Sequence, residues 1–155
     1  MMGIINSNVV TQIGFVVRSI EKSKKIFSDF LGIEVPESIH SGNFDITQTE
    51  YRGSQAPFAE CLLAFFHAND NLSIELIEPN GHPSAWQEFL DEKGEGIHHI
   101  AFNIKGMKEN IISCENFGMK LIQKGEYGDA SGRYAYLDAT EQLNTVIELL
   151  ENDRD

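Results

Sequence analysis

The chain is short of three things: positive charge, cysteine and long apolar runs. Its 12 lysines and arginines face 24 aspartates and glutamates, which gives a formal net charge of −12. This balance argues against a partner with a phosphate backbone and against an anionic membrane surface. No run approaches the roughly 20 apolar residues that a membrane-spanning helix requires. We therefore expect no nucleic-acid partner and no membrane partner.

The two cysteines, Cys61 and Cys114, form no CxxC pair and make no disulfide framework. Residues 1–7 lack the basic region and long apolar run of a secretory leader. With 155 residues, 41% of them hydrophobic, the chain is long enough to bury a core. These features predict a cytoplasmic protein.

Segment 96–104 alternates between two faces with the period of a β-strand. His98 shares the bulky face with Ile100, so we interpret it as a packed core histidine. His99 shares the other face with Ala101, where small side chains leave room for a ligand. His99 is therefore the first candidate site residue.

An earlier strand pattern at 12–17 repeats this alternation, with Gln12 standing 87 positions before His99. Each strand is followed by a helical pattern that ends at a glycine. Two copies of one unit explain the repeat most simply. Within a single domain over 1–155, we predict one unit at about 10–79, a linker helix within 80–96 capped by Ser84, and a second unit at 97–151.

Each predicted unit has the order β-α-β-β-β. The first comprises a strand at 11–17, a helix from the Ser19 N-cap to Gly32, a ragged strand and loop over 33–58, and hairpin strands at 61–66 and 72–78. The segment 33–58 is expected to cover a site. The second comprises strands at 97–104, 121–125, 133–138 and 145–150, a helix at about 107–117, and a turn at 128–132.

Two further strands carry a carboxylate, Glu75 or Glu148, opposite bulky side chains. A carboxylate is costly to bury there unless it is paired or bound to a metal. With Gln12 and His99 they offer two carboxylates, an amide oxygen and an imidazole. Such ligands suit one divalent ion, such as Zn, Ni, Co, Mn or Fe(II), with positions left open for water or substrate.

A metal held in this way polarises a carbonyl or enolate oxygen, while a carboxylate beside it moves a proton on the neighbouring carbon. The chemistry indicated is enolisation of a small-molecule substrate. Four side chains are candidates to contact that substrate: Tyr51, Arg52, Arg133 and Tyr134.

The segments that carry these residues resemble the vicinal oxygen chelate superfamily. This superfamily includes lactoylglutathione lyase (glyoxalase I), methylmalonyl-CoA epimerase, extradiol dioxygenases and antibiotic-resistance proteins. The matching segments are 12–17, 74–79, 94–102 and 146–149. The resemblance implies an α+β fold in which paired βαβββ modules form a cupped mixed sheet, with helices on its outer face and a metal in the cup.

The resemblance places the metal ligands on Gln12, Glu75, His99 and Glu148, a set like that of glyoxalase I. There the last glutamate is also the proton-transfer base, so Glu148 would take that role. A metal-dependent lyase or isomerase, most like lactoylglutathione lyase, is the function implied first. The sequence around Glu75 and His99 is also similar to that of methylmalonyl-CoA epimerases, which usually have histidine at the position of Gln12. Extradiol dioxygenases, with two histidines in the iron site, are less similar.

Two alternatives stay open. Epimerase-like racemisation of an acyl thioester needs a base on each face of the carbon, and Glu50 is the carboxylate we nominate for it. A metal-free module of the resistance-protein type would bind a small ligand, and it predicts that Glu75→Gln and Glu148→Gln are harmless or stabilising. The resemblance permits a cup closed within one chain or between two chains, and we expect a homodimer.

Overall fold

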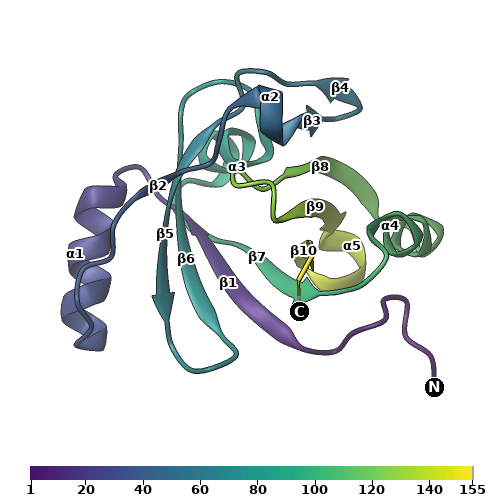
Figure 1. Cartoon of the computed structure of the whole chain (residues 1–155), viewed down its shortest axis with the longest axis horizontal. Helices are drawn as coiled ribbons and strands as arrows, with labels where there is room; N and C mark the ends of the chain where they lie inside the picture. The colour runs from purple at the N-terminus through teal and green to yellow at the C-terminus, as the bar shows by residue number, and fades with distance from the viewer. Residues whose placement is uncertain (155) are drawn as a thin grey trace.

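In the computed structural model, residues 1–154 are described and form one curved sheet of ten strands with five helices. The strands are β1 (Val10–Val16), β2 (Ile39–His40), β3 (Glu50–Tyr51), β4 (Ser54–Gln55), β5 (Cys61–His67), β6 (Ser73–Pro79), β7 (Gly96–Asn103), β8 (Lys120–Glu126), β9 (Gly132–Ala139) and β10 (Thr145–Asn152). The helices are α1 (Ile20–Leu31), α2 (Phe44–Thr47), α3 (Ala85–Lys93), α4 (Met107–Asn116) and α5 (Thr140–Leu143). The predicted α+β fold with a cupped mixed sheet is confirmed (Figure 1).

The sheet order is β2-β5-β6-β1-β7-β10-β9-β8-β3-β4. At its centre β1 pairs antiparallel with β7, and these are the first strands of the two predicted units. On either side β1 runs parallel to β6, and β7 runs parallel to β10. Both halves of the cup therefore come from a single chain, which resolves the alternative that the sequence left open.

Helices α1 and α4 lie on the outer face of the two halves, one at each side of the molecule (Figure 1). As predicted, α1 has Ser19 as its N-cap and ends at Gly32 in the left-handed conformation. Ile20 packs with Phe66 and Leu76 in a buried cluster under α1. A second cluster lies under α4. These apolar contacts hold each helix against its half of the sheet.

Helix α3 has a larger role than that of a linker. Its N-cap is Ser84, as predicted, but it packs with inner-face residues of the sheet and not on the outer face. Trp86 and Leu90 pack with Ile77, and the Trp86 Nε1–H donates to the hydroxyl of Tyr136 at 3.0 Å. Helix α3 therefore fills one end of the cup.

Residues 33–58 cover the cup, as predicted, but their local structure differs from the predicted ragged strand. They form the two-residue strand β2, the four-residue helix α2 and the hairpin β3–β4. The hairpin precedes β5 in the chain, yet it pairs with β8 of the other half. Figure 1 shows α2, β3 and β4 together above the two halves of the sheet. The cover thus crosses from one unit to the other.

A contact between two glycines, here called the glycine clasp, joins the cover to the turn after β8. A Cβ on Gly42 would lie 2.5 Å from the Cα of Gly128. Gly42 also has a φ of 110°, which favours glycine. The clasp brings residues 41–43 and 127–129 together, and both stretches line the cavity described below.

Replacing Gly42 by alanine is expected to lower the free energy of unfolding by roughly 1–3 kcal/mol, because the new Cβ meets backbone that cannot swing aside. Gly53→Ala is the matched control, since Gly53 has a φ of 83° but nothing within 4 Å of an added Cβ. Denaturant unfolding measures both variants. Equal losses would show that the clasp contributes nothing beyond backbone strain.

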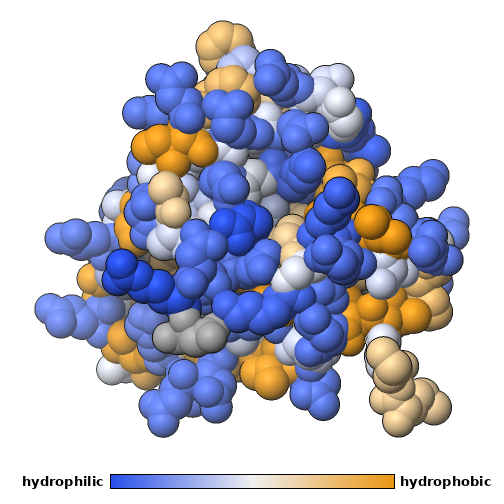
Figure 2. Space-filling view, turned by 45° about the vertical axis from the view of Figure 1, so that its right-hand side comes forward, coloured by the Kyte–Doolittle hydropathy of each residue, from blue (hydrophilic) through white to orange (hydrophobic). Residues whose placement is uncertain are grey.

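Among residues 1–154, no helix is long and apolar enough to cross a membrane. The face of the molecule in Figure 2 is largely hydrophilic, with apolar side chains in separate groups. Because one chain completes the cup, the cavity requires no second copy, and the expected homodimer stays a prediction.

Candidate metal centre

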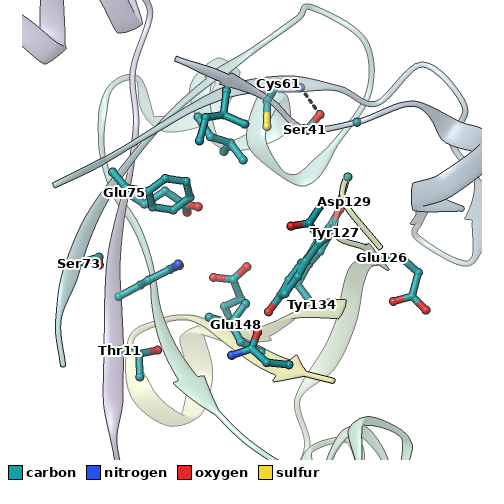
Figure 3. A pocket seen from close by; sticks show the side chains of 18 of the residues that line it. Thr11, Ser41, Cys61, Ser73, Glu75, Glu126, Tyr127, Asp129, Tyr134 and Glu148 are labelled. Carbon is teal, nitrogen blue, oxygen red and sulfur yellow. Dashed lines mark hydrogen bonds between the residues drawn. The ribbon is translucent and has the colours of Figure 1, made fainter. Parts of the chain in front are cut away.

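The four predicted ligands come from the four central strands of the sheet. Gly14 of β1 is in register with Glu75 of β6 on one side and with His99 of β7 on the other. Gln12 lies two residues along β1, and Glu148 stands on β10 beside β7. Figure 3 shows Glu75 and Glu148 pointing into the same cavity. Strand pairing therefore brings together residues that are far apart in the sequence.

Three of the ligand atoms converge closely. His99 Nε2 lies 2.8 Å from Glu148 Oε2 and 3.4 Å from Glu75 Oε1, and all three side chains are buried. These distances are short, but the geometry satisfies no directed hydrogen bond. Nε2, both carboxylate oxygens and Gln12 Oε1 are buried without a hydrogen-bond partner. Of the five such atoms in residues 1–154, four belong to the predicted ligands.

The charges of the cluster are not balanced by the protein alone. Burial lowers the pKa of His99, but Glu148 and Glu75 outweigh it and raise this pKa to about 10. If both carboxylates are ionised, two negative charges face one positive charge even with His99 protonated. Burial raises the pKa of Glu75, His99 opposes this and Glu148 adds to it. A divalent cation would compensate the carboxylates and occupy the unpartnered lone pairs, so the residues fit a metal bound by nitrogen and oxygen.

Gly14 makes room for the imidazole ring of His99. A Cβ on Gly14 would lie 2.0 Å from His99 Cε1 and 2.5 Å from its Nδ1. The alternation of the sequence places Gly14 on the face with the small side chains but does not reveal this role. A glycine inside a strand, two residues from a candidate ligand, was the available signal, because such a glycine marks a close approach.

His98 contacts the other side of that imidazole. A β-bulge in the pairing of β1 with β7 interrupts the alternation, and the His98 ring packs against Phe89 and Tyr136. The predicted packing is confirmed, but the predicted place on the outer, bulky face is wrong. His98 Nδ1 lies 3.0 Å from His99 Nδ1. One nitrogen donates to the other, which leaves Nε2 of His99 directed at the carboxylates.

The centre lies at the wall of a cavity of about 960 Å³. Gln12, Glu75 and Glu148 line this cavity, whereas His99 is fully buried behind them. Ser41 and other residues of the cover form part of the opposite wall (Figure 3). The space is large enough for a small-molecule substrate beside the ligands.

Only one of the four predicted substrate contacts, Tyr134, lines the cavity. Tyr51 and Arg52 both bind Glu88 of α3 outside it. Arg133 forms ion pairs with three carboxylates: Glu126, Glu151 and Asp153. The structure therefore does not bring Tyr51, Arg52 and Arg133 into the cavity lining, because their polar groups are used in ion pairs and hydrogen bonds with other side chains.

Several aromatic side chains of the lining were missed from the sequence. They are Phe65, Trp86, Tyr127 and Tyr136. The Tyr127 hydroxyl has no hydrogen-bond partner among the described residues, and burial, with a contribution from Glu148, raises its pKa. It therefore keeps its proton and is free to donate it to a ligand (Figure 3). No sequence pattern marked Tyr127, because its place depends on the turn held by the glycine clasp.

The variant Gly14→Ala is expected to weaken divalent-ion binding by at least about tenfold, because it displaces the His99 ring from its position. Competition with a chromophoric chelator measures the affinity. Gly32→Ala, at the left-handed end of α1 and far from the centre, controls for a general loss of stability. Wild-type affinity in Gly14→Ala would contradict the assignment of His99 as a ligand.

Metal binding is expected to release about one proton at neutral pH, because a ligating imidazole must be neutral while His99 is protonated without metal. Affinity should therefore rise with pH until the pKa of about 10 is passed. Calorimetric titration with Zn²⁺ in two buffers of different ionisation enthalpy gives the proton count. Binding without proton release would contradict the role of His99.

Comparison with known proteins agrees with the resemblance inferred from the sequence. Residues 11–136 match the sequence model of the Glyoxalase/Bleomycin resistance protein/Dioxygenase superfamily. The uncharacterized protein YqjC of Bacillus subtilis (strain 168) is 27% identical over 145 residues, which cover 93% of this chain and 92% of that protein.

Solved structures of methylmalonyl-CoA epimerases share the fold. The enzyme from Mycobacterium tuberculosis is 20% identical, with a TM-score of 0.65 over 98% of this chain and 93% of that one. A variant of the Streptomyces coelicolor enzyme, in complex with 2-nitronate-propionyl-CoA, is 18% identical with a TM-score of 0.68. That match covers 95% of this chain and 99% of that one.

Proposed function

This chain belongs to the Glyoxalase/Bleomycin resistance protein/Dioxygenase superfamily, and we propose that it is a metal-dependent enzyme that transfers a proton at a carbon next to a carbonyl group. The observation that carries the proposal is the cluster of four buried ligand atoms without hydrogen-bond partners. They belong to Gln12, Glu75, His99 and Glu148, and the first, second and fourth of these side chains line a cavity large enough for a substrate.

A divalent ion bound by these four side chains would supply a Lewis acid for a carbonyl oxygen. The residues around this position have separate roles in the proposed reaction. Glu148, at the cavity wall, takes the proton from the neighbouring carbon and returns it. Tyr127 donates its free hydroxyl proton in a hydrogen bond to a substrate oxygen. The aromatic rings of Trp86 and Tyr136 exclude water from this wall of the cavity.

We favour a one-base reaction of the lyase or isomerase type, as in lactoylglutathione lyase, over epimerisation. Glu50, nominated as the second base, lies on β3 within 3.6 Å of Lys124 Nζ and outside the cavity lining. A metal-free binding module is less well supported, because it leaves Glu75 and Glu148 buried beside each other with a single imidazole.

Metal content tests the binding half of the proposal. After dialysis against a mild chelator and reloading with Zn²⁺, Ni²⁺, Co²⁺ or Mn²⁺, wild type should hold about one equivalent of the preferred ion. Glu148→Gln should lose most of it, whereas Glu50→Gln, which removes a carboxylate outside the cavity, should match wild type. No retained metal in wild type would contradict the proposal.

Exchange of a substrate proton for deuterium tests the chemical half. In heavy water, the metal-loaded protein is expected to exchange the proton next to the carbonyl of at least one of three probes: dihydroxyacetone, the glutathione hemithioacetal of methylglyoxal, or methylmalonyl-CoA. Glu148→Gln, which removes the base and most of the bound metal together, should slow exchange by about 100-fold or more, and Glu50→Gln should leave it unchanged. A slow Glu50→Gln variant would point instead to epimerisation, and exchange of no probe would contradict an enzyme.

A further inference from the structure

We propose that the cavity selects a carbonyl compound without negative charge and discriminates against acyl-CoA thioesters, glutathione adducts and other anionic substrates. The inference rests on the proposed function, because it names the substrate class of the same site. It is carried by the charged groups that line the cavity, which are all acidic apart from two histidines.

None of the 12 lysines and arginines, all within residues 1–154, lines the cavity. Phosphate and carboxylate groups on ligands are held chiefly by such side chains, often by an arginine that donates two hydrogen bonds. The two histidines of the lining are engaged elsewhere. His40 pairs with Glu60 at 3.0 Å, and His67 Nδ1 lies 3.1 Å from the Ser73 hydroxyl.

Five carboxylates line the same cavity: Asp70, Glu75, Glu126, Asp129 and Glu148. A divalent ion would compensate the two at the metal centre and leave three. Of these, Glu126 is paired with Arg133, which lies outside the lining. Asp129 accepts hydrogen bonds from the backbone and hydroxyl of Ser131, which carry no charge. Asp70 and Asp129 are both exposed to solvent, so with the metal bound they add a negative field to the cavity that is strongest at low ionic strength.

Three of the cations that lie within three residues of the lining in the sequence are already engaged. Arg52 binds Glu88, Lys124 lies 3.6 Å from Glu50, and Lys105 Nζ donates to the backbone oxygen of Asn152 at 2.9 Å. Turning one of these side chains into the cavity would break the contact it makes. For these three cations, the contacts already made oppose entry into the cavity.

The rest of the lining suits an uncharged ligand. Aromatic rings of Phe65, Trp86 and Tyr127 offer apolar faces, and the Tyr127 hydroxyl is free to donate. Amide and hydroxyl side chains stand around them at Asn43 and Thr47, among others. Such groups bind hydroxyl and carbonyl oxygens without requiring charge. The Streptomyces coelicolor epimerase, by contrast, holds a CoA compound.

A matched pair of probes tests the inference: methyl benzoylformate, which is uncharged, and benzoylformate, which differs by a carboxylate. Titration calorimetry on the metal-loaded protein measures both affinities. Fluorescence of Trp86, the single tryptophan, reports whether binding occurs in the cavity. At low ionic strength the ester should bind at least about tenfold more tightly, since like charges repel and salt screens them.

The double variant Asp70→Asn/Asp129→Asn should reduce this preference at least about threefold, because it removes two negative charges from the lining. Glu34→Gln/Glu37→Gln is the matched control, since it removes two exposed charges from residues outside the lining and should leave the preference unchanged. Equal effects of the two double variants would assign the preference to net charge and overturn the role of the cavity.

The metal content of each sample is measured before titration, so that a failure of the proposed function can be distinguished from a failure of the substrate assignment. Wild type without bound metal would contradict the proposed function. Metal-loaded wild type that binds the acid as tightly as the ester would overturn the substrate assignment alone. Binding of neither probe at concentrations up to about 10 mM would also overturn that assignment, because the cavity would then accept no simple uncharged carbonyl compound.

Discussion

The antiparallel pairing of β1 with β7 is the constraint on which the rest of the structure depends. It places Gly14 beside His99 and Gln12 beside Ala101, so each unit sets a small residue next to a candidate ligand of the other. The parallel neighbours β6 and β10 then bring in Glu75 and Glu148. The site therefore exists only when both units of the chain are paired, and folding and site assembly are one event.

This assembly concentrates negative charge in the interior. Buried carboxylates stabilise a fold only when a cation or hydrogen-bond donors compensate them. Here the apolar clusters under α1 and α4 hold the sheet, while the inner face keeps polar atoms without partners. A metal that binds only the folded chain would stabilise it by an amount that grows with the logarithm of its affinity. Stability and the proposed activity are thus linked through the same four residues.

Much of the fold and the four candidate ligands could be predicted from the sequence, because alternation assigns a residue to a face and the repeat aligns Gln12 with His99. The β-bulge that turns His98 toward α3 could not, since a one-residue shift leaves no mark in an alternating pattern. The contacts of Tyr51, Arg52 and Arg133 could not be predicted from the sequence either. A charge or hydroxyl does not by itself indicate which distant side chain it contacts, and Glu88 of the distant α3 decides where two of the three lie.

X-ray absorption spectroscopy of the protein loaded with Co²⁺ or Zn²⁺ tests the central claim most directly, because it reports the atoms bound to the ion. The account predicts nitrogen and oxygen ligands only, with the multiple scattering of one imidazole that Gly14→Ala weakens. The Cys61 thiol lines the same cavity, but burial raises its pKa and so disfavours the thiolate that would bind an ion. A sulfur ligand would therefore contradict the account. A bound ion without an imidazole ligand would contradict it equally.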